Sequence, residues 1–156
     1  MFRGMRRMKQ QLSIEECEAI LKKEPRGVLA IYGEDGYPYA FPMNQFYVDG
    51  SLYFHCAKVG HKIDALAKDN RVSFCVMDEG YRKEGEWPLN IKSVIAFGTI
   101  TKITDPQKAV DVIRKLALKH YPTPESVDAE IAESMKNVCM LELKVDHMTG
   151  KLVNES

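Results

Sequence analysis

Two Asp–Gly pairs constrain the fold of this chain more than any other feature of its sequence. Asp35–Gly36 and Asp49–Gly50 separate three runs that are rich in apolar and aromatic residues, and these runs span residues 27–32, 37–48 and 52–56. An Asp–Gly pair between two such runs is a strong signal for a tight β-hairpin turn. We therefore expect a three-stranded antiparallel meander, in which Pro42 indicates an edge position or a bulge in the second strand.

Three further strands are predicted downstream, over residues 72–77, 93–103 and 138–145. Gly98 lies in the middle of the second of these, where it indicates a bend or a close approach of two backbones. The polar tail from Asp146 is expected to follow the last strand without extending it. Together with the meander, these segments predict six strands.

Helix start and stop signals place four helices around the strands. Ser13 and Glu16 have the spacing of a capping box, and Pro25 ends the helix that they begin. Asp105–Pro106 combines an N-cap residue with a proline at the first helical position. The predicted helices span residues 14–24, 62–68, 106–120 and 126–137.

The order of these elements favours a mainly β fold. Most strands follow one another as hairpins instead of alternating with helices, so the sheet should be predominantly antiparallel. Six strands and one long bent strand predict a small closed or split β-barrel with flanking helices. We expect one domain over residues 1–156, with residues 1–11 as a flexible or partner-contacting N-terminal arm.

Composition excludes several classes of function and favours one compartment. The 22 Lys and Arg residues balance the 22 Asp and Glu residues, so no overall basic field attracts nucleic acid. The four cysteines are scattered without a disulfide-like pattern, which favours a reducing, cytoplasmic environment. No leader-like apolar segment follows the basic N-terminus, and no window has the length of a membrane span. Any anion site must therefore come from a local cluster.

One such cluster lies between the strand at 52–56 and the short helix at 62–68. Lys58, His61 and Lys62 fall within five residues, and Gly60 precedes the helix. The first turn of a helix has unpaired N–H groups and a partial positive charge, and both favour a phosphate. These residues alone leave two interpretations open, a phosphate site and a solvated basic loop.

The sequence around this cluster resembles a known family. Residues 35–44, 53–66, 70–74 and 93–100 closely resemble the Nim-type (nitroimidazole-resistance) branch of the pyridoxamine 5′-phosphate oxidase-related proteins. The resemblance extends over about residues 10–145. It implies an FMN-binding split β-barrel that forms a homodimer, with two flavin sites at the subunit interface.

The resemblance also implies which residues contact the flavin. The implied set is Pro42, Met43 and Asn44 at the isoalloxazine ring, His55 and Cys56 beside the ribityl chain, Lys58, His61 and Lys62 at the phosphate, and Ser93 and Val94 near the flavin of the other subunit. Tyr37 and Tyr39 are left open between the approach to the ring and the core. No catalytic residue is implied.

The chain departs from pyridoxamine 5′-phosphate oxidase itself at two places. The ring strand, residues 41–44, lacks the arginines of that enzyme, and the C-terminus lacks its Trp…Arg substrate element. Oxidation of the vitamin substrate is therefore not expected. We expect an FMN-dependent oxidoreductase that reduces small acceptors such as nitroaromatics or quinones, with NADH or NADPH as a possible reductant.

Other functions compete with this one. The chain could instead bind, store or sense a flavin, a deazaflavin or a haem without turnover, and His55 or His61 would then be an axial ligand of the haem. A third alternative is that the dimer serves as an interaction module. No metal site is predicted from His55, Cys56 and His61, because no second cluster completes the ligand set. Cys56 is expected to pack and not to act as a nucleophile, since His55 points to the opposite face of the strand. His120 and His147 are expected at the surface.

Overall fold

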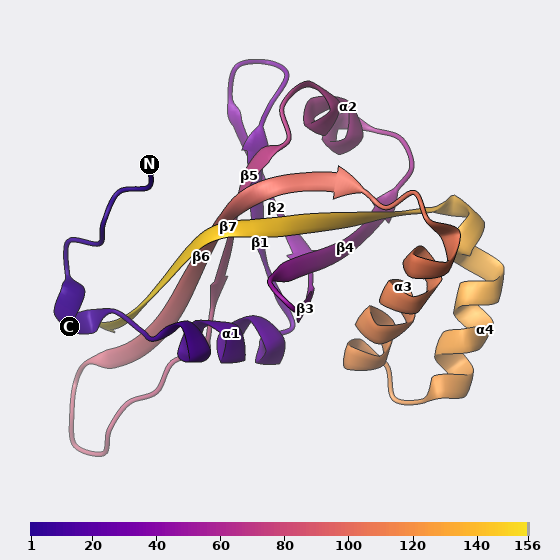
Figure 1. The fold of residues 1–156 in the computed structure, drawn as a ribbon. Coiled ribbons are helices and arrows are strands. Elements are labelled where there is room, and N and C mark those ends of the chain that lie inside the picture. Colours follow the sequence, from indigo (N-terminus) through magenta and orange to yellow (C-terminus); the bar gives the residue numbers. More distant parts are fainter. Residues whose placement is uncertain (156) are drawn as a thin grey trace.

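Both Asp–Gly turns belong to one curled antiparallel sheet, and the computed structural model describes residues 1–155 (Figure 1). The strands are β1 (Arg26–Tyr32), β2 (Pro38–Asn44), β3 (Phe46–Val48), β4 (Ser51–Ala57), β5 (Arg71–Met77), β6 (Leu89–Lys102) and β7 (Val138–Glu155). The α-helices are α1 (Ile14–Lys23), α2 (His61–Lys68), α3 (Pro106–His120) and α4 (Pro124–Ser134), and the short 3₁₀ helices are η1 (Met8–Gln10) and η2 (Met135–Asn137). Across the sheet the strands follow the order β2-β1-β5-β6-β7-β4-β3.

Both predicted hairpin turns are confirmed. The first joins β1 to β2, and Gly36 within it has a φ of 82°. The second joins β3 to β4, and its two central residues, Asp49 and Gly50, have φ values of 49° and 78°. Two positive φ values in a two-residue loop are the mark of a type I′ turn, whose twist matches that of the paired strands.

The prediction of one strand over residues 37–48 is wrong, and so is the predicted count of six strands. The run breaks at Gln45 into β2 and β3, which give the sheet seven strands and form its two opposite edges. Gln45 is fully buried, and its side-chain amide donates to the carbonyl oxygens of Leu21 and Glu24. The chain thus crosses at Gln45 from one edge of the sheet to the other, which curls the sheet into a half-barrel. The edge position predicted from Pro42 is confirmed, since β2 is an edge strand.

The last two strands are longer than predicted. β6 begins at Leu89 and not at residue 93, and β7 continues beyond Val145 to Glu155 along it. The polar tail from Asp146 is therefore strand, because the extended part of β6 offers its backbone groups as partners. The register shifts between Phe97 and Gly98, where the predicted bend lies. A Cβ atom on Gly98 would be 1.9 Å from the carbonyl oxygen of Lys144, so the two backbones meet closely there.

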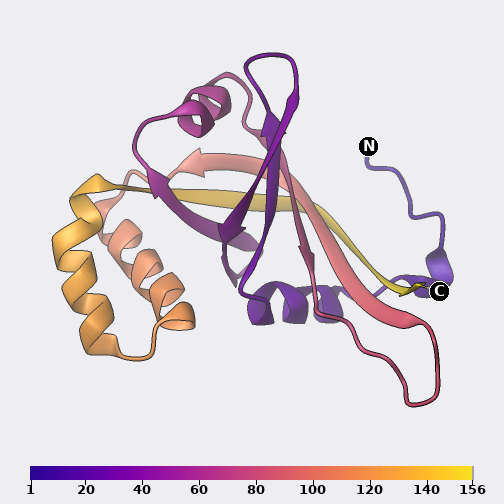
Figure 2. The same ribbon diagram turned by 180° about the vertical axis from the view of Figure 1, so that it is seen from behind.

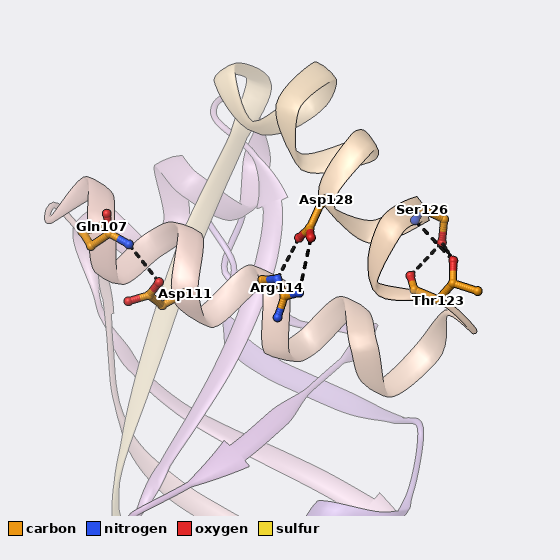
Figure 3. A network of polar contacts seen from close by, with 6 residues as sticks. All are labelled: Gln107, Asp111, Arg114, Thr123, Ser126 and Asp128. Atoms are coloured by element: carbon orange, nitrogen blue, oxygen red, sulfur yellow. Dashed lines mark hydrogen bonds and ion pairs between the residues drawn. The ribbon is translucent and has the colours of Figure 1, made fainter.

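The four predicted helices all form; α1, α2 and α3 pack against different parts of the sheet, and α4 packs against α3 (Figures 1 and 2). The capping box between Ser13 and Glu16 is present at the start of α1. α4 begins at Pro124, two residues earlier than predicted, because Thr123 caps it. α3 and α4 form an antiparallel hairpin, which the ion pair between Arg114 and Asp128 joins (Figure 3).

Two apolar clusters share the strand β4. The larger lies inside the half-barrel and includes Phe54, whose ring meets that of Phe74 edge-on at 5.0 Å. The smaller lies beneath α3 and includes Tyr53, Leu116 and Met140. Because side chains alternate along a strand, Tyr53 and Phe54 serve opposite faces. β4 is therefore the wall between the barrel interior and the α3–α4 hairpin.

Two further observations concern the ends of the chain and its helices. In the N-terminal arm, Phe2 stacks on His147 of β7 with 4.6 Å between the ring centroids, so His147 is half-buried where a surface position was expected. Across residues 1–155, none of the helices combines the length and the apolar character that crossing a membrane requires.

The buried hydrogen bonds of Gln45 lead to a prediction about stability. Gln45→Ala should lower the free energy of unfolding by about 1–3 kcal/mol, because the carbonyl oxygen of Leu21 loses its donor, whereas that of Glu24 keeps the bond from Lys119. Urea unfolding followed by circular dichroism measures this. Gln107→Ala is the matched control, since Gln107 is exposed and bonds only to Asp111, and it should change stability by less than about 0.5 kcal/mol. Equal effects would contradict the assignment.

Candidate functional site

The segment between β4 and α2 has the geometry of an open anion site. Gly60 is the N-cap of α2 and has a φ of 129°, a conformation that favours glycine. No side chain caps this helix, and a Cβ atom built on Gly60 would have no atom within 4 Å. The first N–H groups of α2 are therefore without a side-chain cap and can donate hydrogen bonds to an anionic ligand.

The basic residues beside this turn form no ion pairs with acidic side chains of the described residues. Within residues 1–155, no carboxylate forms an ion pair with Lys58, His61 or Lys62. At the other end of the same helix, Lys68 is paired with Glu34 at 2.5 Å. In a chain with equal numbers of acidic and basic residues, this leaves a local excess of positive charge at the start of α2.

The strand β2 lies against this turn with two aromatic side chains. The ring of Tyr39 stacks on the imidazole of His61, with centroids 4.4 Å apart and an angle of 8° between the planes. The Nζ atom of Lys62 lies 4.3 Å from the centroid of Phe41. Tyr39 therefore packs directly against this site, while Tyr37 is exposed in the preceding turn.

A cavity of about 510 Å³ lies between the sheet and the α3–α4 hairpin. Sites for small organic ligands usually have roughly 300–1,000 Å³. Asn44 and His55 line it on the sheet side, and His120 lines it from α3. The remaining wall is largely apolar and includes Ile113, Leu116, Ala117, Val127, Ile131 and Met135. The sheet side of this cavity thus contains two of the residues implied to contact the flavin.

Both histidines of the cavity have lowered pKa values. Desolvation by the surrounding protein lowers the pKa of His55, although part of its side chain still meets solvent. The pKa of His120 is lowered first by desolvation and then by the positive charges of Lys119 and Arg26. Both imidazoles are therefore neutral at pH 7, and each carries one N–H donor and one acceptor nitrogen.

His120 is the residue of this region that the sequence analysis misplaced. Its Nε2 atom is buried, and no hydrogen-bond partner for it lies within residues 1–155. The expected surface position is therefore wrong. The sequence has no local signal for this wall, because α3 reaches Asn44 and His55 only through the tertiary fold.

The cysteine of the site is shielded. Cys56 lies directly opposite Cys139 in the pairing of β4 with β7, and both thiols are free. Burial raises the pKa of Cys56 to about 11. The thiol is therefore protonated at neutral pH, which agrees with a packing role, since nucleophilic attack requires the thiolate.

Of the remaining residues implied to contact the flavin, two have buried side chains and two face outward. Pro42 is exposed on β2, whereas the side chain of Met43 points into the core. Val94 is fully buried on β6, and Ser93 beside it faces outward. Because β7 separates β6 from β4, a single chain does not bring Ser93 and Val94 next to Lys58, His61 and Lys62.

Comparison with known proteins places this geometry in a family. Residues 13–152 match the family model described as pyridoxamine 5′-phosphate oxidase. No curated protein matches the chain. Three similar solved structures agree with the fold, all at less than 25% sequence identity.

The first is a candidate 5-nitroimidazole antibiotic resistance protein from Bacteroides thetaiotaomicron, with a TM-score of 0.77 and 21% identity over 92% of this chain and 87% of that one. The second is a FAD-binding protein from Mesorhizobium loti, with a TM-score of 0.67 and 23% identity over 92% and 97%. The third is a FAD- and haem-binding protein from Mycobacterium smegmatis, with a TM-score of 0.68 and 22% identity over 92% and 73%.

Each of these likenesses covers 92% of this chain. The family expected from residues 35–44, 53–66, 70–74 and 93–100 is confirmed by the match over residues 13–152. The chain belongs to the pyridoxamine 5′-phosphate oxidase family.

Proposed function

We propose that this protein binds FMN and uses it to reduce small planar acceptors such as nitroaromatics. One observation carries the proposal. Lys58, His61 and Lys62 surround an uncapped helix start that is open at Gly60, and no carboxylate within residues 1–155 neutralises them. A flavin phosphate supplies the negative charge and the hydrogen-bond acceptors that this arrangement lacks.

The residues present fit the other parts of the cofactor as well. β2 is an edge strand, so the backbone groups on its outer side have no strand partner and are available to a flavin ring. Asn44 at its end and His55 on β4 face one cavity. Bound flavin would supply the transfer of electrons, while the protein binds and orients it and sets the charge around the ring.

The cavity beneath α3 and α4 is the proposed acceptor site. Its apolar wall suits an aromatic body, and the neutral imidazole of His55 offers one N–H group to a nitro or carbonyl oxygen. No arginine lines this cavity, so it is not built for a phosphorylated vitamin. This composition favours uncharged planar acceptors.

A homodimer is part of the proposal. Val28, Cys75 and Ile95 lie opposite one another across β1, β5 and β6, and all three are exposed on the outer face of the sheet. Met77 is 65% exposed on the same face, beside Ser93 on the next strand. A second copy of the chain would cover these side chains and bring Ser93 towards the partner's flavin.

The scattered free thiols suit a reducing, cytoplasmic setting.

The first test is the colour of the purified protein. It should be yellow, should release FMN on heating, and should bleach with NADH or NADPH and recover its colour when a nitroimidazole is added. A Soret band would instead favour the haem-binding alternative. Flavin that is bound but never turned over would favour a storage or sensing protein. A colourless protein that does not bind added FMN would exclude the proposal.

Lys62→Ala tests the phosphate assignment. FMN binding should weaken by about 1.5–3 kcal/mol, the range for a hydrogen bond to a charged group. Lys144→Ala is the control, because Lys144 is exposed on β7 at a distance from the open helix start. Fluorescence quenching of FMN measures both affinities, and equal losses would remove Lys62 from the site.

Ile131→Trp tests the acceptor cavity. The larger side chain should fill the space under α4, lowering kcat/KM for the nitroimidazole at least tenfold while FMN still binds, since overpacking acts locally. Ala132→Trp on the exposed side of the same helix is the control. Unchanged kinetics in Ile131→Trp would place the acceptor elsewhere.

Ile95→Lys tests the proposed dimer face. A buried, unpaired ammonium group in the interface should shift the protein towards the monomer in sedimentation velocity measurements. Tyr121→Lys changes a side chain that is 63% exposed and lies away from that face, and it should leave the assembly intact. A monomeric native protein, or an Ile95→Lys variant that still dimerises, would contradict the assignment.

A further inference from the structure

Two aromatic side chains of β2 contact the two basic side chains, His61 and Lys62, that begin α2. Tyr39 stacks on His61, and the ring of Phe41 lies beneath the ammonium group of Lys62 at 4.3 Å. The two aromatic rings also contact each other, with centroids 4.9 Å apart. These four residues form a continuous unit, which we call the aromatic clamp.

The clamp follows from the alternation of β2 and the position of α2. Tyr39 and Phe41 are two residues apart, so both point to the inner face of the strand, where α2 lies. At its far end, α2 is also fixed to the β1–β2 turn by the ion pair of Lys68 with Glu34. Both ends of the helix are therefore attached to one hairpin.

The clamp restricts the polar groups that face the open helix start. Because the imidazole is stacked, its two nitrogens lie in a plane nearly parallel to the ring of Tyr39, and its rotation out of that plane is restricted. The flexible chain of Lys62 is likewise restrained by the attraction of its ammonium group to an aromatic face. Side chains ordered before binding lose less conformational entropy when a ligand arrives.

We propose that Tyr39 and Phe41 are positioning residues that set the preference of this site for a phosphorylated flavin over riboflavin. The inference rests on the proposed binding of FMN. Neither residue needs to touch the phosphate, because Tyr39 acts through the imidazole of His61 and Phe41 acts through the ammonium group of Lys62. The same strand continues to Asn44, so β2 orients the phosphate groups at one end and faces the cavity at the other.

Tyr39→Leu separates this role from a general structural one. Its affinity for FMN should fall by about tenfold, while its affinity for riboflavin should stay within about twofold of the wild type. Tyr39→Phe keeps an aromatic face and should restore the preference. Tyr37→Leu is the matched control, since Tyr37 is 75% exposed in the turn and stacks on neither His61 nor Lys62. Fluorescence titration with both flavins gives the four ratios.

A double-mutant cycle with His61→Ala provides the second measurement. If Tyr39 acts through His61, Tyr39→Leu should have no further effect on FMN affinity once the imidazole is gone. Additive losses, or equal weakening of FMN and riboflavin in Tyr39→Leu, would overturn the inference. Wild-type protein that binds neither flavin would refute the proposed function itself, which is a different result from a lost preference.

Discussion

The buried amide of Gln45 is the contact on which the rest of the architecture depends. It donates to the carbonyl oxygens of Leu21 and Glu24 at the C-terminal end of α1. The ammonium group of Lys119, near the end of α3, donates to the carbonyl oxygens of Glu24 and Gln45 itself. Two helices and both edges of the sheet therefore meet at one corner, where buried donors pair with buried carbonyl oxygens, while the Oε1 atom of Gln45 has no partner within residues 1–155. The orientation of β2, and with it the aromatic clamp and the cavity wall at Asn44, follows from this junction.

Five ion pairs join acidic and basic side chains among the described residues, and the basic side chains at the start of α2 belong to none of them. Most contacts of acidic with basic side chains lie at the surface and hold elements together, as between Arg114 and Asp128 or Lys68 and Glu34. The start of α2 has positive side chains, free N–H groups and no such partner within the described residues. The uncapped helix start and the open space at Gly60 are what distinguish these basic side chains from the others, and on them the proposed phosphate site rests.

Features of this structure that depend on neighbouring residues were predicted from the sequence, whereas features that depend on tertiary contacts were not. The Asp–Gly turns, the capping box at Ser13 and the glycine at position 98 each depend on a few neighbouring residues. The break at Gln45 depends on carbonyl groups more than twenty residues away, so the run 37–48 gave no sign of it. The extension of β7 depends on β6, and the wall at His120 depends on α3 meeting β4. Lys58, His61 and Lys62 were found because they are close in sequence, whereas the role of Tyr39 required the packing of α2 on β2.

The position of β7 has a consequence for how the protein is made. This last strand of the sequence lies between β6 and β4, and its pairing connects the group β2-β1-β5-β6 to the group β4-β3. Residues as distant as Ser51 and Lys144 are opposite one another there. During synthesis on the ribosome, the two groups stay separate sheets with unpaired central edges until β7 emerges. The half-barrel is therefore completed only after β7 has been synthesised, and a chain without β7 would have two incomplete sheets instead of a smaller domain.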